Sequence, residues 1–361
     1  MKNKKKLPLF AKIPLICLAV ILVVIAVVLI LYTVTEYKPD AVEELTTDGS
    51  GAAFPADKTS LSLLSWNIGY CGLSANEDFF MDGGKNIFPE DPLEVPENLE
   101  AVKDVIRNTH ADVTVLQEVD YSSKRTDYLD ETAALLSAFP EQEGVFAYNY
   151  NCFFVPIPVP PLGKMGAGQF TLSNYDIASA QRIQLPCPFT WPTRSCNLKR
   201  CLLVSRIPIE GSDKEWVLIN LHLEAYDSGE GKIAQTRMLV DFMEAEYAKG
   251  NYVIAAGDFN QSFSNIDTSM YPVIDPSFWQ CGKLDASAFG DHFSLVMDTT
   301  YPTCRSLDKE YPGGMPADFQ FYMIDGFIVS SNLSIDTCET ISLDFQNSDH
   351  NPVYLEVSVL P

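Results

Sequence analysis

Residues 251–260 read NYVIAAGDFN. The apolar run from Val253 to Ala256 has the length and composition of a buried strand. Gly257 follows it, and Asp258 and Asn260 then stand two positions apart. A carboxylate and a carboxamide in this position are typical of a turn when they occur alone. A functional interpretation therefore requires that other strands of the chain end in the same way.

Polar side chains do end or interrupt the other strands that the sequence predicts. These strands are predicted at residues 61–65, 112–116, 216–221, 323–329 and 353–359. The polar residues in or beside them are, in chain order, Asn67, Glu118, His222, Asp325, Asp349 and His350. Two of the four histidines of the chain belong to this pattern. Isolated turns do not account for so many polar strand ends.

Helices are predicted between some of these strands. Residues 97–109 place Leu99, Val102 and Ile106 on one helical face, with acidic residues near the start and Arg107 near the end. Further helices are predicted at 130–138 and 232–248, and further strands within 145–183 and at 200–205. Because strands and helices alternate only in part, we expect mixed sheets and not a purely parallel sheet.

The polar residues at the strand ends supply the groups that hydrolysis of a phosphoester needs. Glu118 is a hard oxygen ligand of the kind that Mg²⁺ or Mn²⁺ prefers. Asp258 is suited to deprotonate a water, and Asn260 to donate an amide hydrogen to a phosphoryl oxygen. His350 is suited to bind a phosphate oxygen or to move a proton if a nearby carboxylate such as Asp325 holds its ring. These groups together predict a metal site, an activated water and donors for a phosphoryl group.

The order and wording of these segments resemble the endonuclease/exonuclease/phosphatase superfamily, which includes pancreatic deoxyribonuclease, inositol polyphosphate 5-phosphatases and bacterial sphingomyelinases. The matching stretches, within residues 61–354, are SWNIGY, LQEVD, INLHLEA, AAGDFN, MIDGFIV and SDHNPV. The resemblance implies an α/β fold, a four-layer α/β sandwich in which two mixed β-sheets pack face to face with helices outside. It also implies metal-dependent hydrolysis of a phosphoester, with Mg²⁺, or Mn²⁺ or Ca²⁺, as the cofactor.

The resemblance also assigns roles, position by position. The metal-binding positions of the superfamily match Asn67, Glu118 and Asp349. The catalytic positions match His222, Asp258, Asn260, Asp325 and His350. Tyr148 and Arg200 match as contacts for the phosphate of the substrate. Among its departures from the superfamily, the sequence has LSNYDI where an S-R-Y-P-like turn is usual, and no glutamate is placed to pair with His222 as in the deoxyribonucleases.

Residues 15–32, LICLAVILVVIAVVLILY, are eighteen consecutive apolar residues. At ~1.5 Å per residue a helix of this length approaches the hydrocarbon thickness of a bilayer. The run is longer than the apolar region of a cleaved signal peptide, and no A-x-A-like site follows it. Lysines precede the run and acidic residues follow it, which predicts a cytoplasmic N-terminus and an extracellular domain. A secretory signal with an unusual cleavage site is the alternative.

The chain therefore divides into four predicted segments. They are a cytoplasmic basic tail (1–12), a transmembrane signal anchor (13–32), a polar linker (33–58) and an endonuclease/exonuclease/phosphatase-like domain (59–361). Eight of the nine cysteines follow the anchor, an even number that permits disulfides, and Cys187 with Cys196 is a plausible pair. None of them has the spacing of zinc ligands. We expect a monomer that is anchored in the cell membrane of a bacterium.

The charge of the chain bears on its substrate. The formal net charge is −23, although five of the 25 basic residues lie within the first twelve residues. The rest of the chain is therefore strongly acidic and does not attract nucleic acid through its overall field. An acidic domain does suit a site that gathers divalent cations.

Three classes of function remain open at this point. The first is an extracellular nuclease or general phosphodiesterase, which the breadth of the motif match favours. The second is a lipid phosphodiesterase of the sphingomyelinase kind, in which residues 153–161, FFVPIPVPP, would form an apolar insertion loop. We expect this segment instead to cover the core or to line a pocket. The third is a catalytically inactive surface binding module, which the complete set of acidic, amide and histidine residues disfavours.

Overall fold

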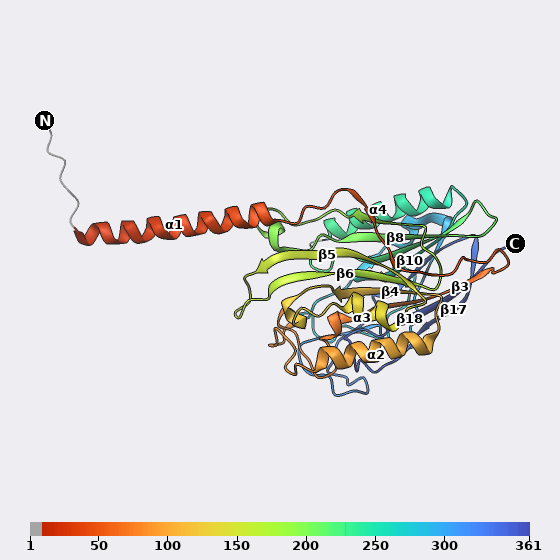
Figure 1. The fold of residues 1–361 in the computed structure, drawn as a ribbon. Helices are drawn as coiled ribbons and strands as arrows, with labels where there is room; N and C mark the ends of the chain where they lie inside the picture. Colours follow the sequence, from red (N-terminus) through yellow and green to blue (C-terminus); the bar gives the residue numbers. More distant parts are fainter. Residues whose placement is uncertain (1–8, 228) are drawn as a thin grey trace.

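Two mixed β-sheets pack face to face and carry helices on their outer faces (Figure 1). The structure is a computed structural model and describes residues 9–227 and 229–361. One sheet has seven strands in the order β1 (Val42–Leu45), β7 (Ser179–Gln184), β8 (Cys201–Pro208), β9 (Glu215–His222), β10 (Tyr252–Asp258), β16 (Asp325–Ser330) and β13 (Phe293–Val296). The other has seven in the order β17 (Leu333–Thr340), β18 (Val353–Val359), β3 (Ser60–Asn67), β4 (Val113–Asp120), β6 (Gly163–Ser173), β5 (Glu143–Val155) and β2 (Asp48–Gly49). Each sheet is antiparallel except for one parallel pair, β9–β10 and β3–β4, respectively.

Three apolar cores separate the four layers. The central core lies between the two sheets and contains side chains such as Leu63 and Ile254. α2 (Glu94–Thr109) and α3 (Glu131–Ala138) cover the sheet that contains β3, and Leu99 is one of their buried contacts. α4 (Glu230–Tyr247) covers the other sheet through Leu239 and Met243. The inner strands are buried on both faces, which explains why they appear in the sequence as nearly continuous apolar runs.

The predicted elements agree with the structure, with shifts of a few residues at their ends. The strand expected at 61–65 is β3 and extends to Asn67, and the helix expected at 97–109 begins at Glu94. Neither β13 nor β17 was predicted. Two small two-stranded sheets were not predicted either. One pairs β11 (Gln261–Phe263) with β12 (Gly282–Leu284), and the other pairs β14 (Cys304–Arg305) with β15 (Phe321–Tyr322). The predicted tail, residues 1–12, lies largely outside the described residues.

Residues 36–58 fold onto the domain and do not form the free linker that their polar composition predicts. β1 pairs with β7 and β2 pairs with β5, so both are edge strands. Phe54 is buried in the central core, where its ring lies 5.8 Å from that of Trp216. Edge strands are commonly polar because one side of the strand faces solvent, which explains the misleading composition.

α1 (Leu9–Thr35) projects from the body of the domain as one long helix (Figure 1). Its stretch Lys12–Thr35 is long and apolar enough to cross a membrane by length and composition, and none of that stretch is buried in the protein. The helix therefore fits either a membrane anchor or a signal sequence. The polypeptide enters the folded domain directly after Thr35.

Residues 153–161 form the exposed tip of the hairpin between β5 and β6, so the expectation that they cover the core or line a pocket is wrong. Ile157 is 70% exposed and Val159 is 90% exposed. The neighbouring strand β4 ends at Asp120, opposite Ala167 of β6. The hairpin continues beyond that point, where no other strand of the described residues accompanies it. The nine cysteines are all free thiols, so the pairing of Cys187 with Cys196 is not formed.

Candidate active site

The register of the strands brings distant polar residues into one row. In the sheet that contains β10, Asp258 lies opposite His222 of β9 on one side and opposite Asp325 of β16 on the other. In the facing sheet, Asn67 at the end of β3 lies opposite Gln117 of β4. Because parallel strands end at the same edge of a sheet, both rows lie at one end of the sandwich.

A buried hydrogen bond between the sheets fixes the separation of these two rows. The Gln117 side chain donates from Nε2 to Oδ1 of Asn220, at 2.9 Å. Asn220 in turn donates to the carbonyl oxygens of Leu116 and Phe170, each at 3.1 Å. Buried hydrogen bonds of this kind permit one arrangement and penalise others. The two halves of the site are therefore held at a defined distance.

An irregularity in β4 directs Glu118 into the site. The pairing of β4 with β6 shifts register between Leu116 and Val119, and Glu118 has a φ of +54°. A positive φ is unfavourable for a residue with a side chain and persists where the surrounding structure requires it. Bulges of this kind redirect a side chain, and here Glu118 Oε1 accepts a hydrogen bond from Asn67 Nδ2 at 3.3 Å.

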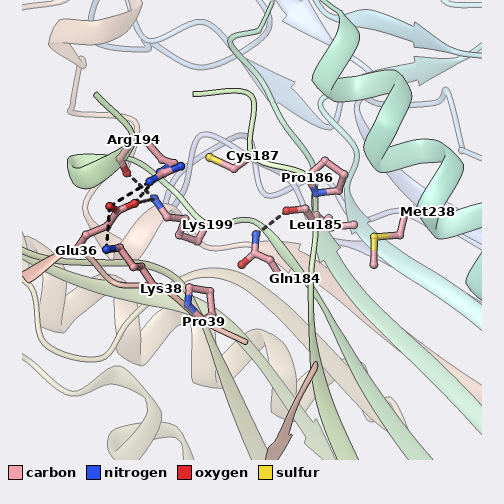
Figure 2. A pocket seen from close by; sticks show the side chains of 10 residues that line it. All are labelled: Glu36, Lys38, Pro39, Gln184, Leu185, Pro186, Cys187, Arg194, Lys199 and Met238. Atoms are coloured by element: carbon pink, nitrogen blue, oxygen red, sulfur yellow. Dashed lines mark hydrogen bonds and ion pairs between the residues drawn. The ribbon is translucent and has the colours of Figure 1, made fainter. Parts of the chain in front are cut away.

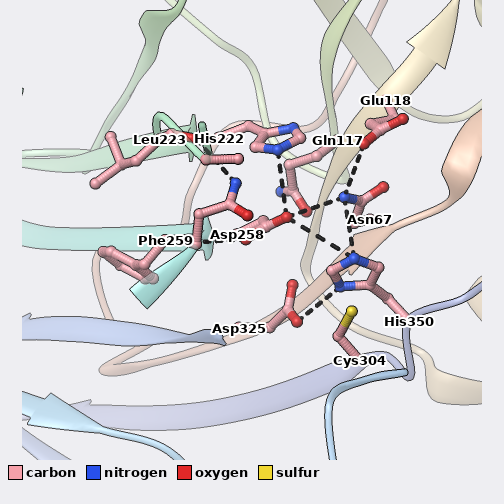
Figure 3. Close-up of polar contacts among 12 residues, drawn as sticks. Asn67, Gln117, Glu118, His222, Leu223, Asp258, Phe259, Cys304, Asp325 and His350 are labelled. Carbon is pink, nitrogen blue, oxygen red and sulfur yellow. Dashed lines mark hydrogen bonds and ion pairs between the residues drawn. The ribbon is translucent and has the colours of Figure 1, made fainter. Parts of the chain in front are cut away.

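Asp258 is the residue on which the side chains of the site converge (Figure 3). Its Oδ2 lies 3.3 Å from His222 Nε2 and accepts a hydrogen bond from Asn67 Nδ2 at 3.1 Å. Its Oδ1 accepts from the backbone N–H of Asn260 at 2.8 Å. Burial, together with the charge of Asp325, raises the pKa of Asp258 to about 7. A carboxylate with this pKa is suited to accept a proton near neutral pH.

The two histidines have opposite electrostatic environments. The Nδ1 of His350 lies 2.8 Å from Asp325 Oδ2, which orients the ring so that Nε2 faces Asp258 (Figure 3). Burial opposes the charged imidazolium, but the acidic groups around it, Asp325 first among them, raise the pKa of His350 well above its ordinary value. Burial and the charges of Arg200 and His350 lower the pKa of His222 well below its ordinary value. These environments favour the charged form of His350 and the neutral form of His222.

Three carboxylates of the site lie near enough to one another for their charges to interact. Glu118, Asp349 and Asp82 line the same cavity. Burial and neighbouring carboxylates raise the pKa of Asp349 to about 6 and that of Asp82 to about 7. Gly69 lies so close that a Cβ on it would stand 3.0 Å from Asp349 Oδ1, so a glycine here leaves room for that carboxylate. Crowded oxygen ligands that destabilise one another's charge are the donor set that Mg²⁺ or Mn²⁺ neutralises.

The cavity above these groups has a volume of about 130 Å³. Seven of the lining residues belong to the predicted set, namely Glu118, Arg200, His222, Asp258, Asn260, Asp349 and His350. Arg200 is buried, donates to the carbonyl oxygen of His222 at 3.3 Å, and leaves its Nε without a hydrogen-bond partner. A buried guanidinium with unused donors is suited to bind a phosphate. Asn67 and Asp325 lie beneath the cavity and hold the reactive side chains in place.

Three predicted site residues do not line the cavity: Asn67 and Asp325, which lie beneath it, and Tyr148. Its ring packs against those of Phe146 and Tyr121, with ring centroids 4.9 and 5.8 Å away. We therefore leave Tyr148 out of the candidate site.

Sequence reasoning also missed residues that belong to the site. Asp82 lies in the loop before α2, where no strand marks it. Asn220 stands within the INLH stretch and was overlooked beside His222. The cavity is also lined by aromatic residues, namely Tyr70, Phe79, Tyr226, Phe278, Trp279 and Tyr322. The loops that carry them have no period that a pattern search would detect.

Solved structures share the fold at low sequence identity. An endonuclease/exonuclease/phosphatase from Beutenbergia cavernae DSM 12333 is 18% identical, with a TM-score of 0.56, and the match covers 84% of this chain and 72% of that one. TDP2 of D. rerio, complexed with a single-strand DNA product, is 14% identical, with a TM-score of 0.52 and coverage of 84% and 100%. The human Nocturnin catalytic domain, with a bound sulfate anion, is 16% identical, with a TM-score of 0.52 and coverage of 87% and 97%.

A family model gives the more direct assignment. No curated protein matches the chain. The model of the Endonuclease/Exonuclease/phosphatase family matches residues 64–316, which include the end of β3 and all of β4, β9 and β10, with their polar ends. The chain belongs to the Endonuclease/Exonuclease/phosphatase family.

Proposed function

We propose that this chain is a divalent-metal-dependent phosphodiesterase whose centre is built around Asp258 and His350. The observation that carries the proposal is the convergence on Asp258, which His222 and Asn67 contact while Asp325 holds His350 beside it. The members of the family are hydrolases of phosphoester bonds. The arrangement therefore provides a base, a cationic acid and neutral donors around one point.

The protein groups divide the hydrolysis among them. Asp258 accepts a proton from the water as its oxygen attacks phosphorus and the ester P–O bond breaks. His350, held charged by Asp325, donates a proton to the departing oxygen. Arg200 and the neutral His222 donate to the non-bridging oxygens, where negative charge develops.

The metal in this proposal belongs to the carboxylates of the cavity. Glu118 and Asp349 would hold it, and Asp82 lines the same cavity as a third carboxylate. When bound, Mg²⁺ or Mn²⁺ supplies positive charge to the phosphoryl group and to the leaving oxygen. Asn67 positions Glu118 through the hydrogen bond between their side chains.

The same proposal assigns α1 as a membrane anchor with a cytoplasmic N-terminus and an extracellular catalytic domain. The length and hydropathy of Lys12–Thr35 support the span. The lysines before the span and the acidic residues after it support the orientation.

The substrate is a phosphodiester, and a lipid head group is the alternative to nucleic acid. The strongly acidic domain opposes nucleic acid, and the exposed apolar hairpin tip favours a membrane substrate. If the chain cleaves no phosphodiester, the alternative of a catalytically inactive binding module is favoured.

Hydrolysis of bis(p-nitrophenyl) phosphate by the full chain in nanodiscs tests the centre. With Mn²⁺ present, we expect Asp258→Asn and His350→Ala each to lower kcat/KM by about 10³-fold, because general acid–base groups contribute ~10²–10⁴. His292→Ala is the matched control, since His292 is exposed and pairs with Glu244 at 2.9 Å, away from the cavity. Retention of full activity by His350→Ala with unchanged circular dichroism would contradict the assignment.

A further inference from the structure

We infer that the catalytic domain rests on the bilayer that holds α1, through the β5–β6 hairpin tip, so that the cavity takes phosphodiester head groups of lipids in that same membrane. This inference rests on the proposed function, because it needs both the anchor and a phosphodiesterase centre. It goes further by naming the docking surface and the source of the substrate.

The docking surface is a group of exposed apolar side chains beside the end of α1. It consists of Phe153, Phe154, Ile157, Val159 and Trp191, which are between 38% and 90% exposed. Single exposed apolar residues are common on soluble proteins, whereas a cluster at the tip of a hairpin indicates a binding surface. The tip adds prolines and no charged residue over 153–161.

Direct contacts attach this surface to the end of the anchor. The ring of Phe153 lies 5.7 Å from that of Tyr32 in α1. Trp191 Nε1 donates to Thr33 Oγ1 at 3.1 Å. Glu36, one residue beyond α1, accepts from Arg194 Nε at 2.8 Å. These contacts hold the domain directly against the end of α1 without a flexible linker. The hairpin tip therefore lies beside the end of α1 (Figure 1), which is where the helix would leave the bilayer.

Basic side chains surround the apolar surface, although the domain as a whole is acidic. Lys38, Arg194 and Lys199 line a hollow beside the end of α1 (Figure 2), where Glu36 balances only part of their charge. Lys124 and Lys164 are exposed at the base of the hairpin. Lysine and arginine beside an apolar, tryptophan-containing surface match the head-group region of a membrane. This combination favours a lipid surface over a protein partner.

The cavity opens at the same end of the molecule as the hairpin. Asp120, two residues after Glu118, lies opposite Ala167, which in turn pairs with Tyr150 of β5. From Tyr150 the strand continues to Val155, which at ~3.3 Å per residue carries the tip roughly 17 Å past the catalytic edge. The loop before α2 connects the hairpin with the cavity. Its Phe80 and Phe88 pack on the hairpin, and its Phe79 and Asp82 line the cavity.

These lengths place the catalytic edge close to the lipid head groups. Interfacial segments bury their apolar side chains about 5–10 Å into the boundary of the acyl chains. A tip inserted to that depth leaves roughly 10 Å between the catalytic edge and the hydrocarbon, and the head-group layer fills about 5–8 Å of it. A head group therefore reaches the cavity without extraction of its lipid.

Fluorescence quenching in full-length protein tests the docking. In a Trp191→Phe background, Val159→Trp and the control Leu360→Trp are reconstituted in nanodiscs with lipids brominated on the acyl chains. Leu360 is 46% exposed and lies at the opposite end of the domain (Figure 1). The Trp191→Phe parent retains Trp66, Trp216 and Trp279, so its emission is subtracted from that of each variant. We expect the remaining emission of the tryptophan at 159 to fall at least twofold and that of the tryptophan at 360 to stay unchanged. Equal emission from both, in protein that floats with the lipid, would overturn the docking.

Activity on two substrates tests the second half of the inference. Nanodiscs of phosphatidylcholine, sphingomyelin and phosphatidylglycerol report release of phosphorylated head groups, and bis(p-nitrophenyl) phosphate reports the centre alone. We expect the double variant Ile157→Asp/Val159→Asp to lose at least tenfold on lipid and less than twofold on the soluble diester. Ile233→Asp, on the exposed face of α4, is the control and should change neither rate.

The outcomes separate this inference from the proposed function. Equal loss on both substrates by a double variant with unchanged circular dichroism would overturn the docking role, because the tip would then act on the centre and not on access to lipid. Cleavage of the soluble diester without cleavage of any lipid would overturn the lipid substrate while leaving the phosphodiesterase intact. Failure of the wild-type chain to cleave either substrate would sink the proposed function, whatever the quenching shows.

Discussion

At the scale of single residues, a few buried side chains have conformations or charges that stability alone does not favour. Glu118 has a positive φ, and Asp258 is buried with a raised pKa. Arg200 is buried with an unused donor. Such costs concentrate at functional sites, because the geometry that chemistry needs is not the most stable one.

Arg200 tests whether such a residue serves activity at the expense of stability. We expect Arg200→Met to lower kcat/KM for bis(p-nitrophenyl) phosphate by about 100-fold, since loss of one donor to a developing oxyanion costs ~10²–10³. We expect its thermal midpoint to stay equal or to rise, because a well-packed apolar side chain replaces a poorly paired buried charge.

The control for Arg200→Met is another buried arginine. Arg182 is 1% exposed and donates to Tyr148, Gln184 and Lys199 at 2.9, 2.8 and 2.7 Å. Arg182→Met should lower stability by ~2–3 kcal/mol and leave kcat/KM nearly unchanged in the folded protein. If Arg200→Met were the less stable of the two variants and kept its activity, Arg200 would be a structural residue.

At the scale of elements, the parallel pair β9–β10 positions the catalytic row. Gly257 of β10 lies opposite Leu221 of β9 with a φ of +146°, and a Cβ on it would stand 1.9 Å from the Leu221 carbonyl oxygen. The close approach aligns Asp258 with His222 in the next register position. Only glycine permits it without a shift of the backbone.

Gly257→Ala should therefore lower the free energy of unfolding by roughly 3 kcal/mol or more, measured by urea denaturation of the full chain in detergent. Gly211→Ala is the matched control, because Gly211 also has a positive φ, +72°, but has nothing within 4 Å of the added Cβ. We expect the control to cost about 1 kcal/mol. Similar losses for the two variants would show that the approach of β9 to β10 is not tight.

The sequence was sufficient to predict the strands that are buried on both faces, because their apolar runs and polar ends are local signals. It was not sufficient for β1 and β2, whose polar composition resembles that of a linker although they pair at the sheet edges. The same limit applies to Asp82, which reaches the cavity through a loop. Tyr148 was misplaced because strand membership alone does not say which end of the strand faces the site.

At the scale of the whole molecule, the anchor, the hairpin and the catalytic edge lie at one end of the sandwich (Figure 1). The apolar run of residues 15–32 and the segment 153–161 were both visible in the sequence. Their proximity was not, because it depends on the register of β5 with β6 and on the contact between Tyr32 and Phe153. Long-range pairing of this kind leaves no trace in a local pattern.

The proposed mechanism depends most on a metal that the carboxylates of the cavity hold and that hydrolysis requires. The most direct test strips the full chain in nanodiscs with a chelator and follows hydrolysis of bis(p-nitrophenyl) phosphate as Mg²⁺ or Mn²⁺ is added back. We expect no rate above background without metal and a saturable recovery as metal is added. We also expect Glu118→Gln to need at least tenfold more metal than the wild type, whereas the exposed control Glu100→Gln does not. An undiminished rate in the metal-free protein, or identical metal requirements for Glu118→Gln and the wild type, would contradict the metal requirement.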